Sequence, residues 1–328
     1  MKNFISLIIF FQIINVNAQV TRSRVVTLMG SRFDITIVAK DTPTAEAYID
    51  SSIIEISRIE KLISDWIPES QVSQINKNAG IQPVKVDKEL IELSKRALHF
   101  SELTNGAFDI SFAAADRIWK FDGSMTAIPS AEVVAESVKK IGYKNILINE
   151  EESTIFLKFP GMKIGFGATG KGYAADKTKE LMISKGVDAG IINASGDLNT
   201  WGKQPNGDNW IIGITNPMKE DELFAAFELS GTAVVTSGNY EKFVMIDHKR
   251  YSHIIDPRTG YPSSGLSSVT IFADTAEKAN GISTAIMVLG KKAGLKFLKK
   301  NTDLKGIIID DKGKIVYSKK FNIKKYKL

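Results

Sequence analysis

The sequence predicts an α+β fold in which mixed, largely antiparallel sheets pack against helices. From residue 145 onward the chain contains many short runs of β-branched and aromatic residues bounded by Gly, Asn, Asp and Ser, which is typical of strands. The helical segments are few, and they do not alternate with the strands as they would in a doubly wound sheet. Many strands against a few helices therefore favour α+β.

The individual elements follow from the spacing of apolar residues. Apolar and polar residues alternate in Phe33-Asp34-Ile35-Thr36-Ile37, which predicts two strands from Val25 to Ala39 around Met29-Gly30-Ser31. Helical spacing predicts helices over about 44–62, 88–103 and 275–289, and a further helix from Gly167 to Ser184. Strands are expected at 146–148, 154–157, 162–164, 190–193, 210–214, 233–236 and 268–272.

Length and composition favour one domain after an export signal. The chain has 328 residues, 43% of them hydrophobic and 24% charged, without a Pro/Gly/Ser-rich linker. Lys2, the apolar run Phe4 to Ile14 and the small residue Ala18 predict a signal peptide at residues 1–18, because the run is shorter than the roughly 20 residues of a membrane-spanning helix. Residues 19–328 are expected to form a single domain with a basic C-terminal tail.

Cysteine and charge exclude several functions. The absence of cysteine excludes disulfides, thiolate metal ligands, a cysteine nucleophile and a lipid anchor on cysteine. The net charge is +6, and many lysines lie between Lys291 and Lys327. Since no aromatic residues or nucleic-acid fold signature accompany them, we expect a solvated tail and no nucleic-acid partner. The mature protein is expected to be exported and not to be an integral membrane protein.

A glycine-rich segment from Gly165 to Tyr173 contains Lys171 and lies between a predicted strand and a predicted helix. Small residues let a ligand approach backbone N–H groups, and a helix start favours an anion, so a phosphate site is one interpretation. The segment does not have the spacing of a Walker loop, and no alternating βαβ series surrounds its G-x-G-x-x-G match. An ordinary tight strand-to-helix turn explains this segment equally well.

Two later segments carry side chains with catalytic chemistry. His253, in the segment from Tyr251 to Pro262, can exchange protons near neutral pH, and Asp256 could orient it, bind a metal or simply brace a turn with Arg258. Asn280 and Thr284 lie four residues apart on a predicted helix, where two oxygen donors could hold a hard cation such as Mg²⁺. The alternative is a core helix on which Asn280 is incidental.

Seven motifs, taken in order, resemble those of the ApbE family of FAD:protein FMN transferases, and the likeness runs from about Val25 to Gly290. They are 29–31 (MGS), 64–66 (SDW) with 70–76 (SQVSQIN), 106–109 (GAFD), 167–176 (GATGKGYAAD), 194–197 (ASGD), 236–242 (TSGNYEK) and 253–260 (HIIDPRTG). The resemblance implies a T-fold-like flavin transferase fold.

The same resemblance implies roles for individual residues. FAD would contact Met29, Trp66, Ala107, Phe108, Asp109 and Ile254, with Lys171 at its pyrophosphate. Mg²⁺ would be held by the backbone around Ala168 and by Asn280, Ser283 and Thr284. His253 would be the catalytic residue that moves a proton.

The sequence departs from the family pattern at two positions outside these motifs. Asn280 stands where the family normally has an aspartate, and Gly165 where it has an acidic residue. An amide oxygen compensates less charge than a carboxylate, so weaker metal binding and slower transfer are expected. Glu277, one helical turn before Asn280, is a candidate to compensate.

The implied reaction is transfer of FMN from FAD to a Ser or Thr hydroxyl of an acceptor protein, with release of AMP and dependence on Mg²⁺. The acceptor would carry a short Ser/Thr flavinylation motif and belong to the exported or membrane electron-transfer proteins, in the bacterial periplasm or envelope. Two alternatives stay open, which are hydrolysis of FAD to FMN and AMP, and a catalytically weak FAD-binding protein.

Overall fold

A large antiparallel sheet forms the centre of the computed structural model, which describes residues 19–240 and 242–326. The predicted signal peptide, residues 1–18, lies outside the described residues. The strand order within the described chain is β1-β2-β6-β7-β10-β13-β14-β15, and each neighbouring pair is antiparallel. The strands are β1 Val20–Leu28, β2 Ser31–Ala39, β6 Ala189–Ala194, β7 Asp197–Trp201, β10 Ala233–Gly238, β13 Leu266–Ala273, β14 Lys305–Asp310 and β15 Ile315–Tyr317.

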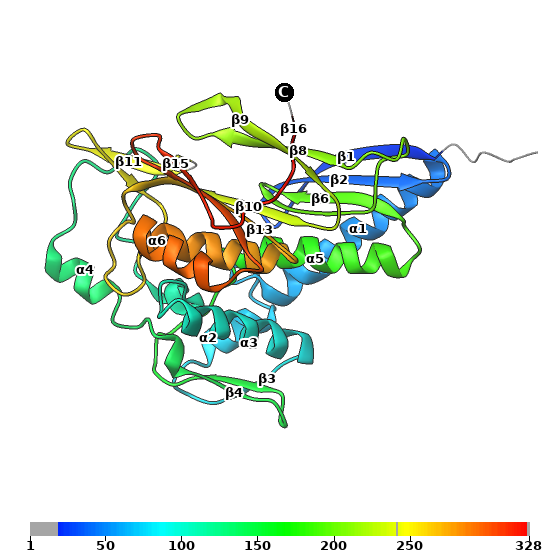
Figure 1. Ribbon diagram of the computed structural model, residues 1–328. Coiled ribbons are helices and arrows are strands. Elements are labelled where there is room, and N and C mark those ends of the chain that lie inside the picture. Colours follow the sequence, from blue (N-terminus) through cyan, green and yellow to red (C-terminus); the bar gives the residue numbers. More distant parts are fainter. Residues whose placement is uncertain (1–18, 241, 327–328) are drawn as a thin grey trace, which may run out of the picture.

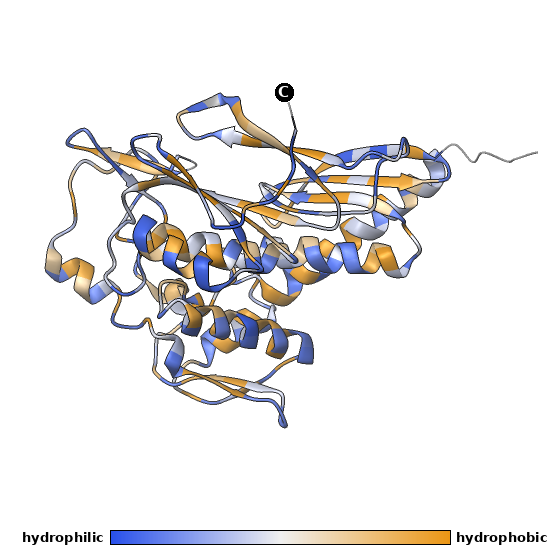
Figure 2. Cartoon of the chain, in the orientation of Figure 1, coloured by the Kyte–Doolittle hydropathy of each residue, from blue (hydrophilic) through white to orange (hydrophobic). Residues whose placement is uncertain are grey.

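Three long helices cover one face of this sheet (Figure 1). They are α1 Thr42–Ile63, α5 Thr169–Ser184 and α6 Ala276–Lys300. The helices α2 Gln71–Lys77, α3 Lys88–Leu103 and α4 Ala131–Ser137 lie farther from the sheet. Alternate residues of β2 and the helically spaced isoleucines of α1 are fully buried in one core cluster, as their periods require. Figure 2 shows apolar residues, in orange, on both β2 and α1.

Smaller sheets complete the fold. The sheet β16-β9-β8 packs on the opposite face of the large sheet, where Phe227 meets Phe272 with ring centroids 5.3 Å apart. Because both faces are covered there, every residue of β13 is buried. The remaining elements are β3 Val84–Lys85, β4 Ile146–Asn149, β5 Thr154–Leu157, β8 Trp210–Asn216, β9 Lys219–Leu229, β11 Phe243–Ile246, β12 Lys249–Ser252, β16 Lys325–Tyr326, η1 Ile110–Ala114 and η2 Tyr143–Asn145.

The predicted α+β class is confirmed, and so are the N-terminal hairpin and the helices predicted at about 44–62 and 88–103. The strand predicted at 162–164 is wrong. The amide of Asn76 bonds the backbone of Ile164 twice, with Ile164 N donating to Oδ1 at 2.7 Å and Nδ2 donating to the Ile164 carbonyl at 2.9 Å. A side chain thus takes the bonds that a neighbouring strand would have made.

The last predicted helix is longer than its pattern indicated. It continues as α6 to Lys300 through a kink at Gly290, whose φ of 77° is left-handed and suits glycine. The basic segment that begins at Lys291 contains the end of α6 and strands β14 to β16. Lys292, Lys296 and Lys299 therefore extend from α6, and Ile307, Ile308 and Ile309 of β14 are buried.

Candidate active site

Segments that are distant in the sequence meet around a cavity of about 430 Å³. Its wall comes from residues in 65–66, 107–113, 165–171, 195–197, 236–238 and 253–257, and from Asn280 and Thr284 on α6. The start of α5, the turn before β7 and the end of β10 all face this space. The volume is that of a typical small-molecule site.

Most of the predicted site residues line this cavity. They are Trp66, Ala107, Phe108, Asp109, Ala168, Lys171, His253, Ile254, Asn280 and Thr284. Met29 and Ser283 lie outside its wall. Met29 occupies the turn between β1 and β2 with a φ of 51° and packs near Gly170 at the start of α5. Ser283 is fully buried behind the wall, where its Oγ lies 2.8 Å from Ser237 Oγ.

The N-terminus of α5 forms an anion-binding corner of the cavity. The helix begins at Thr169, and Gly167, Ala168, Thr169 and Lys171 all line the wall. Free N–H groups and the helix dipole favour negative charge at this end, and Lys171 adds a cation. The hydroxyl of Thr169 is buried and has no hydrogen-bond partner within the described part of the chain. A phosphate group at this helix end would be stabilised by the dipole and by the ammonium of Lys171.

Trp66 and Asp109 also line the cavity, and their environments differ. Trp66 is 69% exposed, and the guanidinium of Arg117 lies 4.3 Å from the centroid of its ring. Asp109 instead supports the wall, because its carboxylate accepts bonds from Ser111 N and Oγ and from Tyr143 N. Burial raises the pKa of Asp109, although these hydrogen bonds oppose the shift. Trp66 is therefore the accessible stacking surface of this group.

His253 has a defined tautomer. Its Nδ1 lies 3.0 Å from the carbonyl oxygen of Lys242, which can only accept, so Nδ1 carries the proton and Nε2 of the neutral ring is basic. Burial lowers the pKa of His253, and the charges of Lys242 and Lys171 lower it further against the bond to the carbonyl. The imidazole is therefore neutral at pH 7 and able to accept a proton.

Asp256 braces its loop, which is one of the three roles that the sequence left open for it. Its carboxylate accepts from the backbone N–H of Arg258 at 2.9 Å and pairs with the guanidinium of the same residue at 2.8 Å. These bonds close the turn that carries Pro257 into the cavity wall.

Oxygen donors gather where β7 and β10 meet α6. Asn280 Nδ2 donates to both carboxylate oxygens of Asp197 at 2.9 Å, and Thr284 Oγ1 donates to Asn280 Oδ1 at 3.3 Å. Asp197 and Asn280 are 3% and 8% exposed. Within residues 19–240 and 242–326 no three His, Asp or Glu side chains come together as a metal site. A cation here would therefore depend on a mixed set of carboxylate, amide and hydroxyl oxygens.

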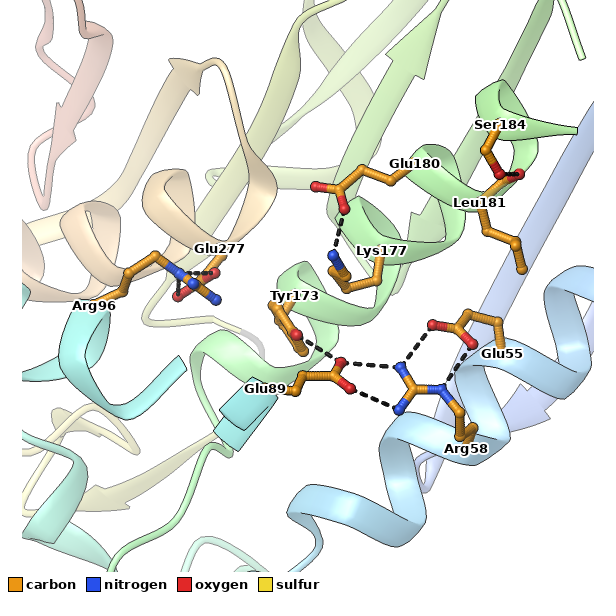
Figure 3. A network of polar contacts seen from close by, with 10 residues as sticks. All are labelled: Glu55, Arg58, Glu89, Arg96, Tyr173, Lys177, Glu180, Leu181, Ser184 and Glu277. Carbon is orange, nitrogen blue, oxygen red and sulfur yellow. Dashed lines mark hydrogen bonds and ion pairs between the residues drawn. The ribbon is translucent and has the colours of Figure 1, made fainter. Parts of the chain in front are cut away.

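Glu277 points toward Arg96 (Figure 3) and does not line the cavity that contains these donors. Its carboxylate binds Arg96 Nε at 2.9 and 3.0 Å and lines a second cavity behind α6. Burial raises the pKa of Glu277, and Arg96 lowers it in opposition. The compensation expected from Glu277 is therefore not supported by its position. At Gly165, an added Cβ would lie 3.4 Å from Asp65 Oδ2, so a carboxylate is already present beside the position where the family has an acid.

Comparison with known proteins gives these features a context. The sequence profile described as the ApbE family matches residues 29–308. This chain belongs to the ApbE family. It is 29% identical to a FAD:protein FMN transferase of Klebsiella pneumoniae, over 89% of this chain and 90% of that protein.

Solved structures of ApbE proteins have the same fold. An ApbE protein from Thermotoga maritima matches with a TM-score of 0.84 and 31% identity, over 92% of this chain and 98% of that chain. The flavinyl transferase ApbE of Pseudomonas stutzeri matches with a TM-score of 0.81 and 26% identity, over 92% and 95%. The predicted family resemblance is confirmed.

Several residues of the ApbE cavity were not predicted as site residues. Asp65, Asp197, Thr236 and Ser237 line it, and Thr169 contributes the buried hydroxyl. All five lie within the motifs that carry the family resemblance, which was the available signal. Their local sequences are also those of ordinary turns and strand ends, so the convergence of these side chains required the tertiary structure.

Proposed function

We propose that this chain is a FAD:protein FMN transferase that moves FMN from FAD to a Ser or Thr hydroxyl of an acceptor protein and releases AMP. As a member of the ApbE family it is a transferase. The observation that carries the finer proposal is the meeting of three groups in one cavity, namely the α5 N-terminus with Lys171, the basic Nε2 of His253, and the oxygen donors near Asn280.

The cavity suits the parts of FAD. The exposed ring of Trp66 offers a face on which a flat heterocycle can stack. The N-terminus of α5 and the ammonium of Lys171 suit the pyrophosphate. Substrate would thereby be held with its phosphorus between the helix end and His253.

The chemistry is displacement at the phosphorus on the FMN side of the pyrophosphate. The acceptor hydroxyl oxygen forms the new P–O bond, and the bond to the AMP oxygen breaks, with its electron pair leaving on AMP. His253 Nε2 takes the hydroxyl proton, a role that its lowered pKa and fixed tautomer suit. Lys171 and the α5 N-terminus stabilise the charge on the phosphate oxygens.

The donor set also suits Mg²⁺, since Asp197, Asn280 and Thr284 offer hard oxygen ligands to one region of the wall. When bound there, the ion would neutralise the pyrophosphate and the charge that develops on the leaving group.

Export and acceptor type are also proposals. The residue pattern of 1–18 supports cleavage after Ala18 and action in a bacterial periplasm or envelope, on an exported or membrane electron-transfer protein with a Ser/Thr motif. Across residues 19–240 and 242–326, the structure contains no helix of the length and apolarity that crossing a bilayer would take. Mass spectrometry of the exported protein should give an N-terminus at Gln19.

A product assay tests the function. Residues 19–328 are incubated with FAD, Mg²⁺ and a candidate acceptor domain, and both AMP and an FMN-sized mass gain on the acceptor are expected. An acceptor with its target Ser or Thr replaced by Ala is the matched control and should gain no mass. AMP without the mass gain would indicate hydrolysis of FAD. The absence of both AMP and the mass gain would contradict the proposal.

A further inference from the structure

The amide of Asn280 leaves a charge problem at the proposed cation site. It stands where ApbE sequences normally have an aspartate, and a neutral ligand does not offset the charge of a divalent ion. A functional site therefore needs a carboxylate from another part of the chain.

The carboxylates near the site are few within the described residues. Glu277 is paired with Arg96 outside the cavity, and Asp109 is bonded to Ser111 and Tyr143 in the wall. Asp65 lies beside Gly165. Asp197 is the carboxylate of the cavity wall that bonds directly to Asn280.

The backbone fixes where Asp197 points. It is the first residue of β7 and follows a tight turn in which Ser195 and Gly196 both have positive φ, at 53° and 94°. The register pairs it with Ala194 on β6 and Val235 on β10, so the strand end is held from both sides. Its carboxylate therefore has a defined place against α6.

The hydrogen bonds give the pair a division of roles. Only an N–H can face a carboxylate, so Asn280 Nδ2 must point at Asp197 and its Oδ1 at Thr284. A carboxylate oxygen accepts more than one bond, so contact with the amide does not prevent it from binding a cation.

We propose that Asp197 supplies the negative charge of the divalent-cation site, and that Asn280 is the positioning residue that holds its carboxylate. Asp197 on β7 thus provides the negative charge that the family normally has at position 280 on α6, and hydrogen bonds join the two side chains. This inference rests on the proposed function, because it concerns the cation of that reaction.

Cation binding measured apart from catalysis tests the inference. Mn²⁺ is titrated into residues 19–328 with FAD present, the free ion is followed by electron paramagnetic resonance, and Mg²⁺ is added as competitor. Asp197→Asn should weaken Mn²⁺ binding by about tenfold or more. Asn280→Ala keeps the carboxylate and should weaken it less than Asp197→Asn does.

Two further variants separate charge from folding. The reversed pair Asp197→Asn with Asn280→Asp keeps the hydrogen bond and the charge, and should restore most of the binding lost in Asp197→Asn. Glu277→Gln removes a buried carboxylate from α6 outside the cavity and should leave Mn²⁺ affinity unchanged. If Asp197→Asn does not fold by circular dichroism, Asn280→Ala decides the question, because it keeps the carboxylate of Asp197 and removes only the amide that holds it.

The outcomes distinguish this inference from the function. Unchanged Mn²⁺ affinity in folded Asp197→Asn, or complete loss in Asn280→Ala, would overturn the role of Asp197 while FMN transfer by the wild type still stood. Wild-type protein that binds Mn²⁺ through Asp197 but forms neither AMP nor flavinylated acceptor would overturn the proposed function alone.

Discussion

Replacing Arg96 by methionine is expected to destabilise the protein more at pH 8 than at pH 5. The substitution keeps much of the apolar stem and removes the guanidinium that binds Glu277 (Figure 3). Glu277 is 6% exposed as a side chain, so its charge would remain buried without a partner. The guanidinium of Arg96 also lies over the ring of Tyr173, 5.4 Å from its centroid, and Tyr173 in turn donates to Glu89, which pairs with Arg58.

The magnitude follows from burial on the two sides of the pair. Removing one partner of a fully buried ion pair costs about 3–5 kcal/mol. The Arg96 side chain is 42% exposed, so water already screens part of the interaction, and we expect about 2 kcal/mol at pH 8. This is large against a typical stability of about 5–15 kcal/mol.

The sign of the pH dependence comes from the pKa of Glu277. Burial raises this pKa above its ordinary value, and the hydrogen bond and charge of Arg96 lower it, so removal of Arg96 raises it further. Below the unfolded pKa of about 4.3 the carboxyl is protonated in both states, and the variant loses little more than packing. As the pH rises through the folded pKa, the unpaired charge forms and the deficit grows.

Urea unfolding at pH 5 and pH 8 measures the effect through the midpoint at constant m-value. The double variant Arg96→Met with Glu277→Gln should recover at least half of the loss at pH 8 and lose the extra pH dependence, because no buried charge remains. Equal deficits at both pH values, or a double variant no more stable than Arg96→Met, would refute the reasoning.

Two further predictions concern the cavity, and a third concerns the start of α6. His253→Gln should slow FMN transfer by about 10²–10⁴-fold with little change in FAD affinity. In the wild type, the acid limb of the pH–rate profile should lie below the ordinary histidine pKa of about 6.5, because burial lowers the pKa of His253. The variant should lack this limb. Trp66→Ala should weaken FAD binding by about tenfold in a flavin fluorescence titration, whereas Trp66→Tyr should stay near wild type; equal losses would argue against stacking. Asp176→Ala orphans the N–H groups of Ala276 and Glu277 at the start of α6 and should cost about 2–4 kcal/mol in urea unfolding, and an unchanged midpoint would contradict this.

Local pattern was sufficient for much of this protein. The period-2 alternation of Phe33, Ile35 and Ile37 predicted β2, and helical spacing predicted α1 and α3, because side-chain direction is set by the backbone dihedral angles of each element. The glycines before Lys171 indicated a helix start able to bind an anion, and α5 begins there at Thr169. Most of the residues that line the cavity also belong to the family motifs, which are recognised from the sequence alone.

Contacts between distant residues were decided only by the tertiary structure. Residues 162–164 have a strand-like composition, but the amide of Asn76, which is 88 positions away from Ile164, takes their backbone bonds. For Asn280 the sequence offered Glu277 as a neighbour, whereas the fold supplies Asp197, which is 83 positions away. Strand register and helix packing determine such partners, and a one-dimensional pattern does not contain them. Most of the residues that line the cavity could therefore be named from the sequence, but the contact between Asp197 and Asn280 could not.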